Sequence, residues 1–136
     1  HLLSRRQRQM CIRDSYYSGY RNLKVLAAIN NRISRKDIEN AMYQVGLDPT
    51  MKKRVATYSL GMRQRLGIAQ AIMEDPSLII LDEPFNGLDK HGVEEMREYF
   101  LSLKKKGKTI LLTSHNTEDI EYLCDTVVEM DHGKFI

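Results

Sequence analysis

One short stretch constrains this chain of 136 residues more than any other: four aliphatic residues at 78–81 run directly into Asp82, Glu83 and Pro84. An unbroken apolar run of this length predicts a short strand buried on both faces. The strand should end at Pro84, because proline has no N–H to donate to a neighbouring strand. Strands of a parallel α/β sheet turn their carboxyl ends toward the ligand crevice, so we expect both acids to lie at such a crevice.

Asp82 and Glu83 are expected to have different roles, because adjacent residues of a strand point to opposite faces of the sheet. Removing two neighbouring carboxylates from water is costly unless a cation or a proton compensates. One acid facing Mg²⁺ and the other facing a water molecule to be activated would meet this requirement. The alternative is a strand that merely ends in a solvated acidic turn, and an isolated acidic pair does not decide between the two.

The composition is that of a single soluble globular domain or a piece of one, with 42% hydrophobic and 29% charged residues. No apolar run approaches the roughly 20 residues of a membrane-spanning helix. Cys11 and Cys124 are far apart and form no CxxC pair, which indicates a reducing compartment rather than a disulfide framework.

The net charge of +3 originates in residues 1–15, which hold four arginines and one aspartate. Outside this segment, basic and acidic side chains are equal in number. An arginine-rich terminus is compatible with an arm that binds nucleic acid or a membrane surface. It lacks the apolar core and cleavage site of a signal peptide. We interpret residues 1–15 as a disordered or foreign tail outside the domain.

Three helices are expected before the acidic strand. Ser18, Ser34 and Ser59 each precede a helical pattern and are suited to the N-cap position. Ser34 and Asp37 have the spacing of a capping box. The helices are predicted at residues 18–31, 34–46 and 59–74.

Helices and strands alternate after the acidic pair. A loop at 85–89 leads into an amphipathic helix with a basic last turn, which favours the helix dipole. Two further strands, a short helix and a hairpin turn follow. These elements are predicted at 90–106 (helix), 109–113 (buried strand), 116–123 (helix), 126–130 (strand) and 131–133 (turn). The order predicts an α/β fold with a mainly parallel sheet and an antiparallel addition.

Four segments in this order and spacing resemble the motifs of the nucleotide-binding subunit of an ATP-binding cassette (ABC) transporter. Residues 59–65, Ser-Leu-Gly-Met-Arg-Gln-Arg, resemble the signature motif, and residues 78–84 resemble Walker B with its catalytic glutamate. Residues 86–89 resemble the D-loop, and Ser114-His115 resembles the switch histidine. The resemblance covers residues 16–136, and the forms of residues 58–62 and 18–23 are most similar to bacitracin-resistance and lantibiotic-immunity exporters.

The resemblance implies a partial P-loop NTPase domain of the ABC type. Residues 16–75 would be its helical subdomain with the signature motif, and residues 76–136 the C-terminal part of its α/β ATPase core. In such a domain Asp82 would hold Mg²⁺, through water for the most part. Glu83 would orient and deprotonate the attacking water, and His115 would contact the γ-phosphate. A lone histidine is more often a structural or surface residue, but the neighbouring motifs favour the functional role here.

The resemblance also implies nucleotide contacts for Ser59, Gly61, Met62 and Asp89, made with ATP held by the other subunit of a dimer. The start of a helix suits an anion, because its first N–H groups are unpaired and its dipole end is positive. Gly61 allows a phosphate to approach the backbone. Ser59 as an ordinary N-cap is a compatible alternative. Leu60 and Met62 depart from the common Gly and Gln, which weakens specific side-chain contacts.

No segment matches G-x-x-x-x-G-K-[ST], the loop whose glycines and lysine cradle phosphates. The resemblance places this Walker A motif upstream, so we interpret the chain as a C-terminal fragment of the cassette. The fragment alone is expected to be inactive, and the intact parent to be an ATPase.

The implied function is part of the motor that uses ATP and Mg²⁺ to export a peptide or other amphiphile. The implied partners are a transmembrane permease and a second nucleotide-binding subunit, which would be identical in a homodimer, and no nucleic acid. The location would be cytoplasmic, at the inner face of the membrane. The alternatives are a truncated, non-enzymatic cassette fragment and a soluble ABC ATPase that does not take part in transport.

Overall fold

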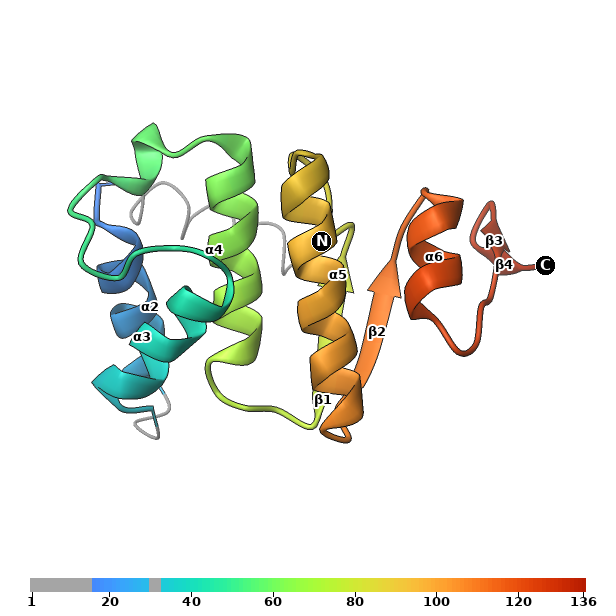
Figure 1. The fold of residues 1–136 in the computed structure, drawn as a ribbon, viewed down its shortest axis with the longest axis horizontal. Helices are drawn as coiled ribbons and strands as arrows, with labels where there is room; N and C mark the ends of the chain where they lie inside the picture. Colours follow the sequence, from blue (N-terminus) through green and yellow to red (C-terminus); the bar gives the residue numbers. More distant parts are fainter. Residues whose placement is uncertain (1–15, 30–32) are drawn as a thin grey trace.

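The structure is a computed structural model that describes residues 16–29 and 33–136 (Figure 1). Helices α2, α3 and α4 lie together at one end, α5 and the strands β1 and β2 lie in the middle, and α6 with the small hairpin lies at the other end. The elements are α2 (Gly19–Ala27), α3 (Arg35–Gln44), the 3₁₀ turn η1 (Val55–Thr57), α4 (Leu60–Ile72), β1 (Leu78–Asp82), α5 (Lys90–Lys105), β2 (Thr109–Thr113), α6 (Thr117–Leu123), β3 (Met130–Asp131) and β4 (Lys134–Phe135). The expectation for residues 1–15 lies outside the described residues.

The three predicted serine caps are confirmed. The side-chain oxygens of Ser18, Ser34 and Ser59 accept hydrogen bonds from backbone N–H groups three residues later, at 3.3, 3.2 and 3.1 Å. Asp37 completes the capping box by accepting from the Ser34 N–H at 3.0 Å. Each cap satisfies N–H groups that the first turn of a helix leaves unpaired.

All three of these helices end earlier than predicted. Helix α2 stops at Ala27 instead of residue 31, α3 at Gln44 instead of 46, and α4 at Ile72 instead of 74. Leu23 and Ala27 are the buried apolar side chains of α2, whereas Ile29 is 74% exposed. Continuing the helix would therefore bury no further apolar surface, and packing of an apolar face is what stabilises short helices.

The helical group packs around a shared core. Its buried side chains include Leu23 of α2, Ile38 and Met42 of α3, and Leu66 of α4. Tyr58 is also buried, and a Cβ atom at Gly19 would lie 2.6 Å from its hydroxyl oxygen. Burial raises the pKa of the Tyr58 hydroxyl, so the ring packs as a neutral group. Because Tyr58 precedes Ser59, this packing fixes the start of α4 on α2.

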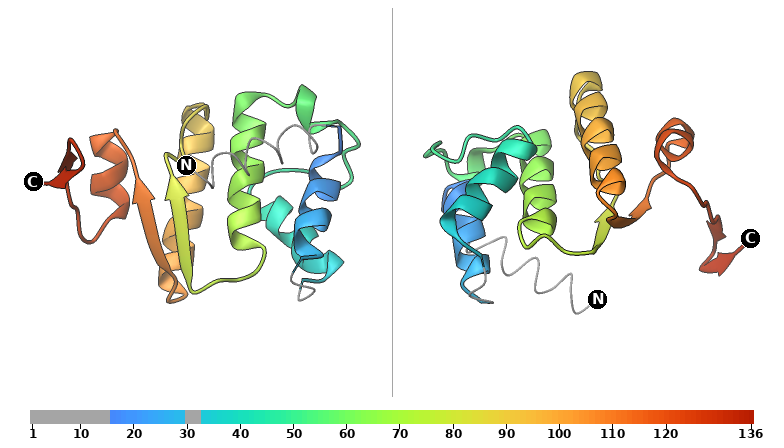
Figure 2. Two further views of the ribbon diagram at one scale, coloured as in Figure 1. Left: turned by 180° about the vertical axis from the view of Figure 1, so that it is seen from behind. Right: turned by 60° about the horizontal axis from the view of Figure 1, so that its bottom comes forward.

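Strands β1 and β2 pair in parallel, from Leu78 opposite Thr109 to Asp82 opposite Thr113. Helix α5 lies across one face of this pair, as both views of Figure 2 show. The core on this face contains Ile79 and Leu81 of β1 together with Met96, Phe100 and Leu103 of α5. The strands predicted at 78–81 and 109–113 are present and pair in parallel as expected, whereas the antiparallel β3–β4 pair forms a separate sheet and is not added to this one.

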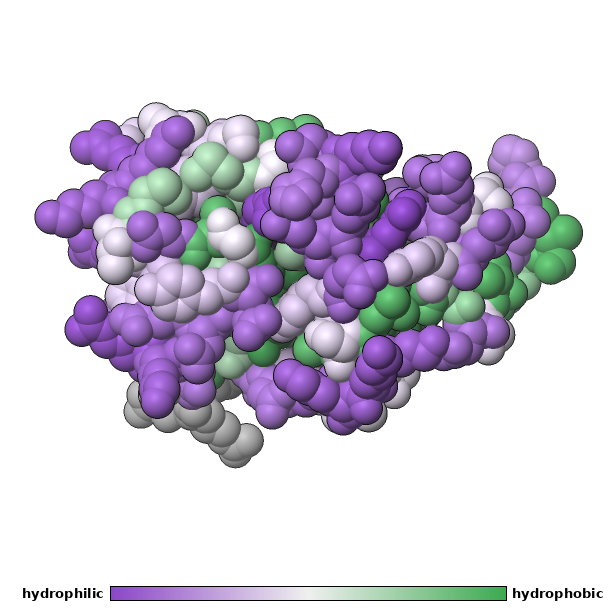
Figure 3. Space-filling view, in the orientation of Figure 1, coloured by the Kyte–Doolittle hydropathy of each residue, from purple (hydrophilic) through white to green (hydrophobic). Residues whose placement is uncertain are grey.

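The prediction that the strand at 78–81 is buried on both faces is wrong for the described structure, and no residue of the strand at 109–113, also predicted to be buried, is fully buried. Leu78, Ile80 and Leu111 are 51%, 65% and 59% exposed, and no described helix covers the face on which they lie (Figure 2, left). The side of the molecule that carries α5 is mostly hydrophilic (Figure 3). The apolar run of β1 has the composition of a strand that is covered on both faces, but the described elements cover only one of its faces.

The strand predicted at 126–130 forms only at its last residue, Met130, which pairs with Phe135 in the β3–β4 hairpin. Val127 and Val128 are 58% and 60% exposed. A strand needs a neighbour for its N–H and C=O groups. The Glu129 carbonyl accepts a hydrogen bond from the Ile136 N–H at 2.9 Å, but the described part of the chain offers residues 126–128 no strand partner.

We expect purified residues 1–136 to bind the dye ANS, because the dye reports exposed apolar surface. Ile80→Thr, which keeps a β-branched side chain on the exposed face, should reduce the ANS fluorescence. Ile79→Thr should instead unfold the chain, because that side chain is 2% exposed. A soluble monomer with a sharp thermal transition and no ANS signal would contradict the expectation.

Candidate functional site

The two parallel strands end side by side, and Thr113 joins the two predicted acids there. Its hydroxyl donates to Asp82 Oδ1 at 2.6 Å. The Glu83 N–H donates to both oxygens of Thr113, with N···O distances of 3.1 Å to Oγ1 and 3.2 Å to the carbonyl oxygen. Sequence reasoning missed Thr113. Its position as the last residue of a strand that ends just before His115 could have identified it.

The backbone of Glu83 has a left-handed conformation, with φ of +47°. A non-glycine residue in this region is held there by its surroundings, at a cost of about 1–3 kcal/mol. The Glu83 carbonyl accepts hydrogen bonds from Gln64 Nε2 at 2.8 Å and from the Asn86 N–H at 3.2 Å. Contacts from α4, β2 and the following loop therefore fix the direction in which the Glu83 side chain leaves the strand.

Glu83 and His115, which the sequence predicts as separate site residues, lie side by side in the structure. Glu83 Oε1 lies 3.2 Å from His115 Nε2. The Glu83 side chain is 23% exposed, whereas that of His115 is 98% exposed. A mostly covered carboxylate thus lies beside an imidazole that a ligand can reach from solvent. This arrangement suits a group that accepts a proton and a group that contacts the ligand.

The start of α4 packs against the loop that follows Glu83. A Cβ atom at Gly61 would lie 2.9 Å from the carbonyl oxygen of Gly87. Gly87 has φ of +78°, and a Cβ atom there would lie 2.6 Å from Leu60 Cγ. Both glycines are therefore required by close packing within this chain, in addition to any contact with a ligand.

The other predicted site residues have structural partners. The Ser59 hydroxyl caps α4, as described above. Met62 is half-buried and packs against the core. The Asp89 carboxylate accepts a hydrogen bond from the Gly92 N–H at 2.7 Å and is the N-cap of α5. Their contacts with a nucleotide stay predictions.

Asp82 offers one exposed carboxylate, one oxygen of which accepts from Thr113. Among the described residues, no group of three or more His, Cys, Asp or Glu side chains is arranged to hold a metal ion. Mg²⁺ in phosphate-transfer sites takes one or two carboxylates and completes its shell with water and phosphate oxygens. A single carboxylate at this position fits that requirement.

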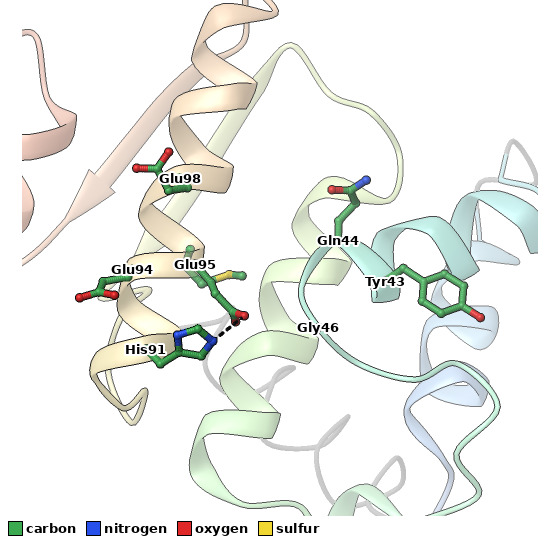
Figure 4. A pocket seen from close by; sticks show the side chains of 8 residues that line it. Tyr43, Gln44, Gly46, His91, Glu94, Glu95 and Glu98 are labelled. Atoms are coloured by element: carbon green, nitrogen blue, oxygen red, sulfur yellow. Dashed lines mark ion pairs between the residues drawn. The ribbon is translucent and has the colours of Figure 1, made fainter.

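A pocket of about 500 Å³ lies between the end of α3 and α5 (Figure 4). It is lined by Tyr43, Gln44, Gly46, His91, Glu94, Glu95, Met96 and Glu98. Glu95 contacts His91 at 3.1 Å and Arg65 of α4 at 3.2 Å. Arg65 also donates to the Val45 carbonyl at 2.8 Å, so it ties α3 and α4 to α5. None of the predicted site residues lines this pocket.

Helix α6 follows the segment that carries His115. The Arg97 side chain of α5 pairs with Asp119 of α6, which is 2% exposed, and its Nε lies 2.8 Å from Oδ1. The Tyr122 hydroxyl donates to Glu98 at 2.6 Å. These contacts hold α6 on α5 and so fix the end of the β2–α6 segment. Within the described residues, no helix is both long and apolar enough to cross a membrane.

Comparison with known proteins agrees with this arrangement of motifs. The family model for the ABC transporter matches residues 4–86. This chain belongs to the ABC transporter family. The match begins inside residues 1–15, the segment that we placed outside the domain on its arginine content.

Several curated relatives match most of the chain. The uncharacterized ABC transporter ATP-binding protein YybJ of Bacillus subtilis is 46% identical over 87% of this chain and 54% of its own length. The bacitracin transport ATP-binding protein BcrA of Enterococcus faecalis is 43% identical over 90% of this chain and 40% of its own length. The lantibiotic transport ATP-binding protein SrtF of Streptococcus pyogenes is 42% identical over 88% of this chain and 52% of its own length. The chain therefore spans about half the length of these relatives.

The fold matches a solved structure described as the dimeric structure of MJ0796, a bacterial ABC transporter cassette. The TM-score is 0.71 at 20% identity, over 79% of this chain and 50% of that one. This likeness establishes the fold, a partial α/β cassette of the P-loop NTPase type, as the sequence predicted.

Proposed function

We propose that this chain is part of the ATP-hydrolysing motor subunit of an ABC transporter. The observation that carries the proposal is the Glu83–His115 pair, placed beside Asp82 where two parallel strands end. In this family of proteins, a partly covered carboxylate with a fixed backbone is suited to act as a general base. Residues 16–75 would form the helical subdomain and residues 76–136 the C-terminal part of the ATPase core.

Each residue of the strand end has a role in this proposal. Asp82 would hold Mg²⁺, which neutralises phosphate charge when bound. Glu83 accepts a proton from the water that attacks the γ-phosphate, and Thr113 keeps the Glu83 backbone in place. His115 donates a hydrogen bond to the γ-phosphate from its exposed position.

The start of α4 would act on the nucleotide of a second cassette, identical or not. Ser59 would supply a hydroxyl and Gly61 would let a phosphate approach the backbone, while Met62 and Asp89 would add further contacts with the nucleotide. The free N–H groups of the first helical turn and the positive dipole end support anion binding there. The dimer named for the similar solved structure supports such a partner.

The proposed cargo is a peptide or other amphiphile, exported through a transmembrane permease. The support is the names of two relatives, which are bacitracin and lantibiotic transport proteins. The subunit would work at the cytoplasmic face of the membrane, bound to the permease. We assign no nucleic-acid partner, because basic and acidic side chains balance outside residues 1–15.

The complete subunit, expressed with its permease, should hydrolyse ATP in Mg²⁺ and lose the activity in EDTA. Cells that carry the complete transporter should tolerate more bacitracin or more of a lantibiotic than cells that carry the Glu83→Gln variant. Equal tolerance to both compounds, with intact Mg²⁺-dependent hydrolysis, would refute bacitracin and that lantibiotic as cargo while leaving the ATPase assignment in place. Absence of hydrolysis would refute the assignment itself.

A further inference from the structure

We propose that Gln64 is a positioning residue for Glu83, which joins the signature helix to the general base of the same subunit. The proposal rests on the function proposed above for Glu83. Its basis is the 2.8 Å hydrogen bond from Gln64 Nε2 to the Glu83 carbonyl, which links two residues 19 positions apart. The contact is partly buried and therefore partly shielded from water.

The bond acts at a residue whose backbone needs support from its neighbours. Glu83 has φ of +47°, and a left-handed conformation of a non-glycine residue persists only where neighbours hold it. Rotation of this residue would swing its carboxylate away from His115, which lies 3.2 Å away. Pro84, the next residue, is fully buried, so the chain beyond the bond is anchored. Gln64 therefore helps to fix Glu83, the single residue between the end of β1 and the buried Pro84.

The same face of α4 holds both ends of the loop that Glu83 begins. Leu60 and Gly61 pack against Gly87, and Gln64 lies three to four residues further on, which is the spacing of neighbours on one helical face. Movement of the first turns of α4 is thus transmitted to Glu83 through Gln64 and to the loop through Gly87. This gives the signature helix a mechanical connection to the hydrolytic acid of its own subunit.

The test uses the complete subunit with its permease and compares three variants. Gln64→Met keeps the length of the side chain and removes the donor. Gln64→Glu keeps the shape and places a carboxylate against the Glu83 carbonyl. Gln70→Met is the matched control, because Gln70 is exposed on the same helix. We measure kcat, KM for ATP, equilibrium ATP affinity and melting temperature for each.

Gln64→Met should lower kcat by about 10- to 100-fold, because small misplacements of a reacting group have effects of this size. Gln64→Glu should lower it further. KM, ATP affinity and melting temperature should stay close to those of the Gln70→Met control. Normal kcat in both Gln64 variants, or a loss that follows melting temperature alone, would overturn the proposal.

Combining Gln64→Met with Glu83→Gln separates the positioning role from a structural one. If Gln64 acts through Glu83, the double variant should be no slower than Glu83→Gln alone. If the two losses multiply, Gln64 acts elsewhere and the proposal is wrong. Normal turnover in Glu83→Gln itself would overturn the proposed general base, and that result is read independently of the Gln64 variants.

Discussion

Glu83→Gln in the complete subunit should leave ATP binding intact and slow hydrolysis by about 10²-fold or more, the range expected for loss of a positioned general base. Glutamine has nearly the shape of glutamate, so the packing around Thr113 and the left-handed backbone should be kept. It cannot accept a proton from water at neutral pH. Single-turnover hydrolysis and nucleotide affinity, measured on the same preparation, separate the chemical step from binding.

Glu94→Gln is the matched control for this experiment. Glu94 lies on α5, is exposed, and does not contact the strand ends, so its replacement removes one negative charge away from the site. The control should keep normal turnover. If Glu83→Gln also kept near-normal turnover, the base would be another group and the role given to Glu83 would be wrong.

Gly61→Asp in the complete subunit should abolish hydrolysis and ATP-driven dimer formation, yet leave ATP binding to the monomer within a few-fold of normal. The new carboxylate would repel the phosphates that the start of α4 is proposed to meet. The structure adds a second effect, because any Cβ atom at this position lies 2.9 Å from the Gly87 carbonyl oxygen. Charge and close contact therefore have to be separated experimentally.

Two controls make this separation. Gly61→Ala introduces the close contact without charge, and it should lower the melting temperature while dimer formation is partly retained. Gly67→Asp introduces the same charge on the same helix where a Cβ atom would meet nothing within 4 Å, and it should be active. Unchanged dimer formation and turnover in Gly61→Asp would remove Gly61 from the site. If Gly61→Ala lost as much dimer formation and turnover as Gly61→Asp, only a structural role would remain for Gly61.

The elements of this fold were largely predictable because their signals are local. An N-cap serine bonds the N–H group three residues later, and an apolar strand followed by proline ends shortly before the proline. Ser34 and Asp37 form their capping box within a single helical turn. Asn116, the first residue of the helix predicted at 116–123, is the N-cap of α6. Where a prediction failed, as at residues 126–128, the missing factor was a neighbouring strand, which no local pattern supplies.

The sequence by itself determined which residues are candidates for the chemistry: an acidic pair at a strand end, a histidine after the next strand, and a serine-capped helix. Their order and spacing were sufficient to predict the family and the partial cassette fold, because each motif is a short run of adjacent residues. The tertiary structure decided how these residues are held. Thr113 forms hydrogen bonds with Asp82, 31 positions away in the sequence, and with Glu83, 30 positions away. Gln64 forms one with Glu83, 19 positions away. Such contacts depend on how β2 and α4 pack against the strand end, and that packing is set by the whole core rather than by any single segment.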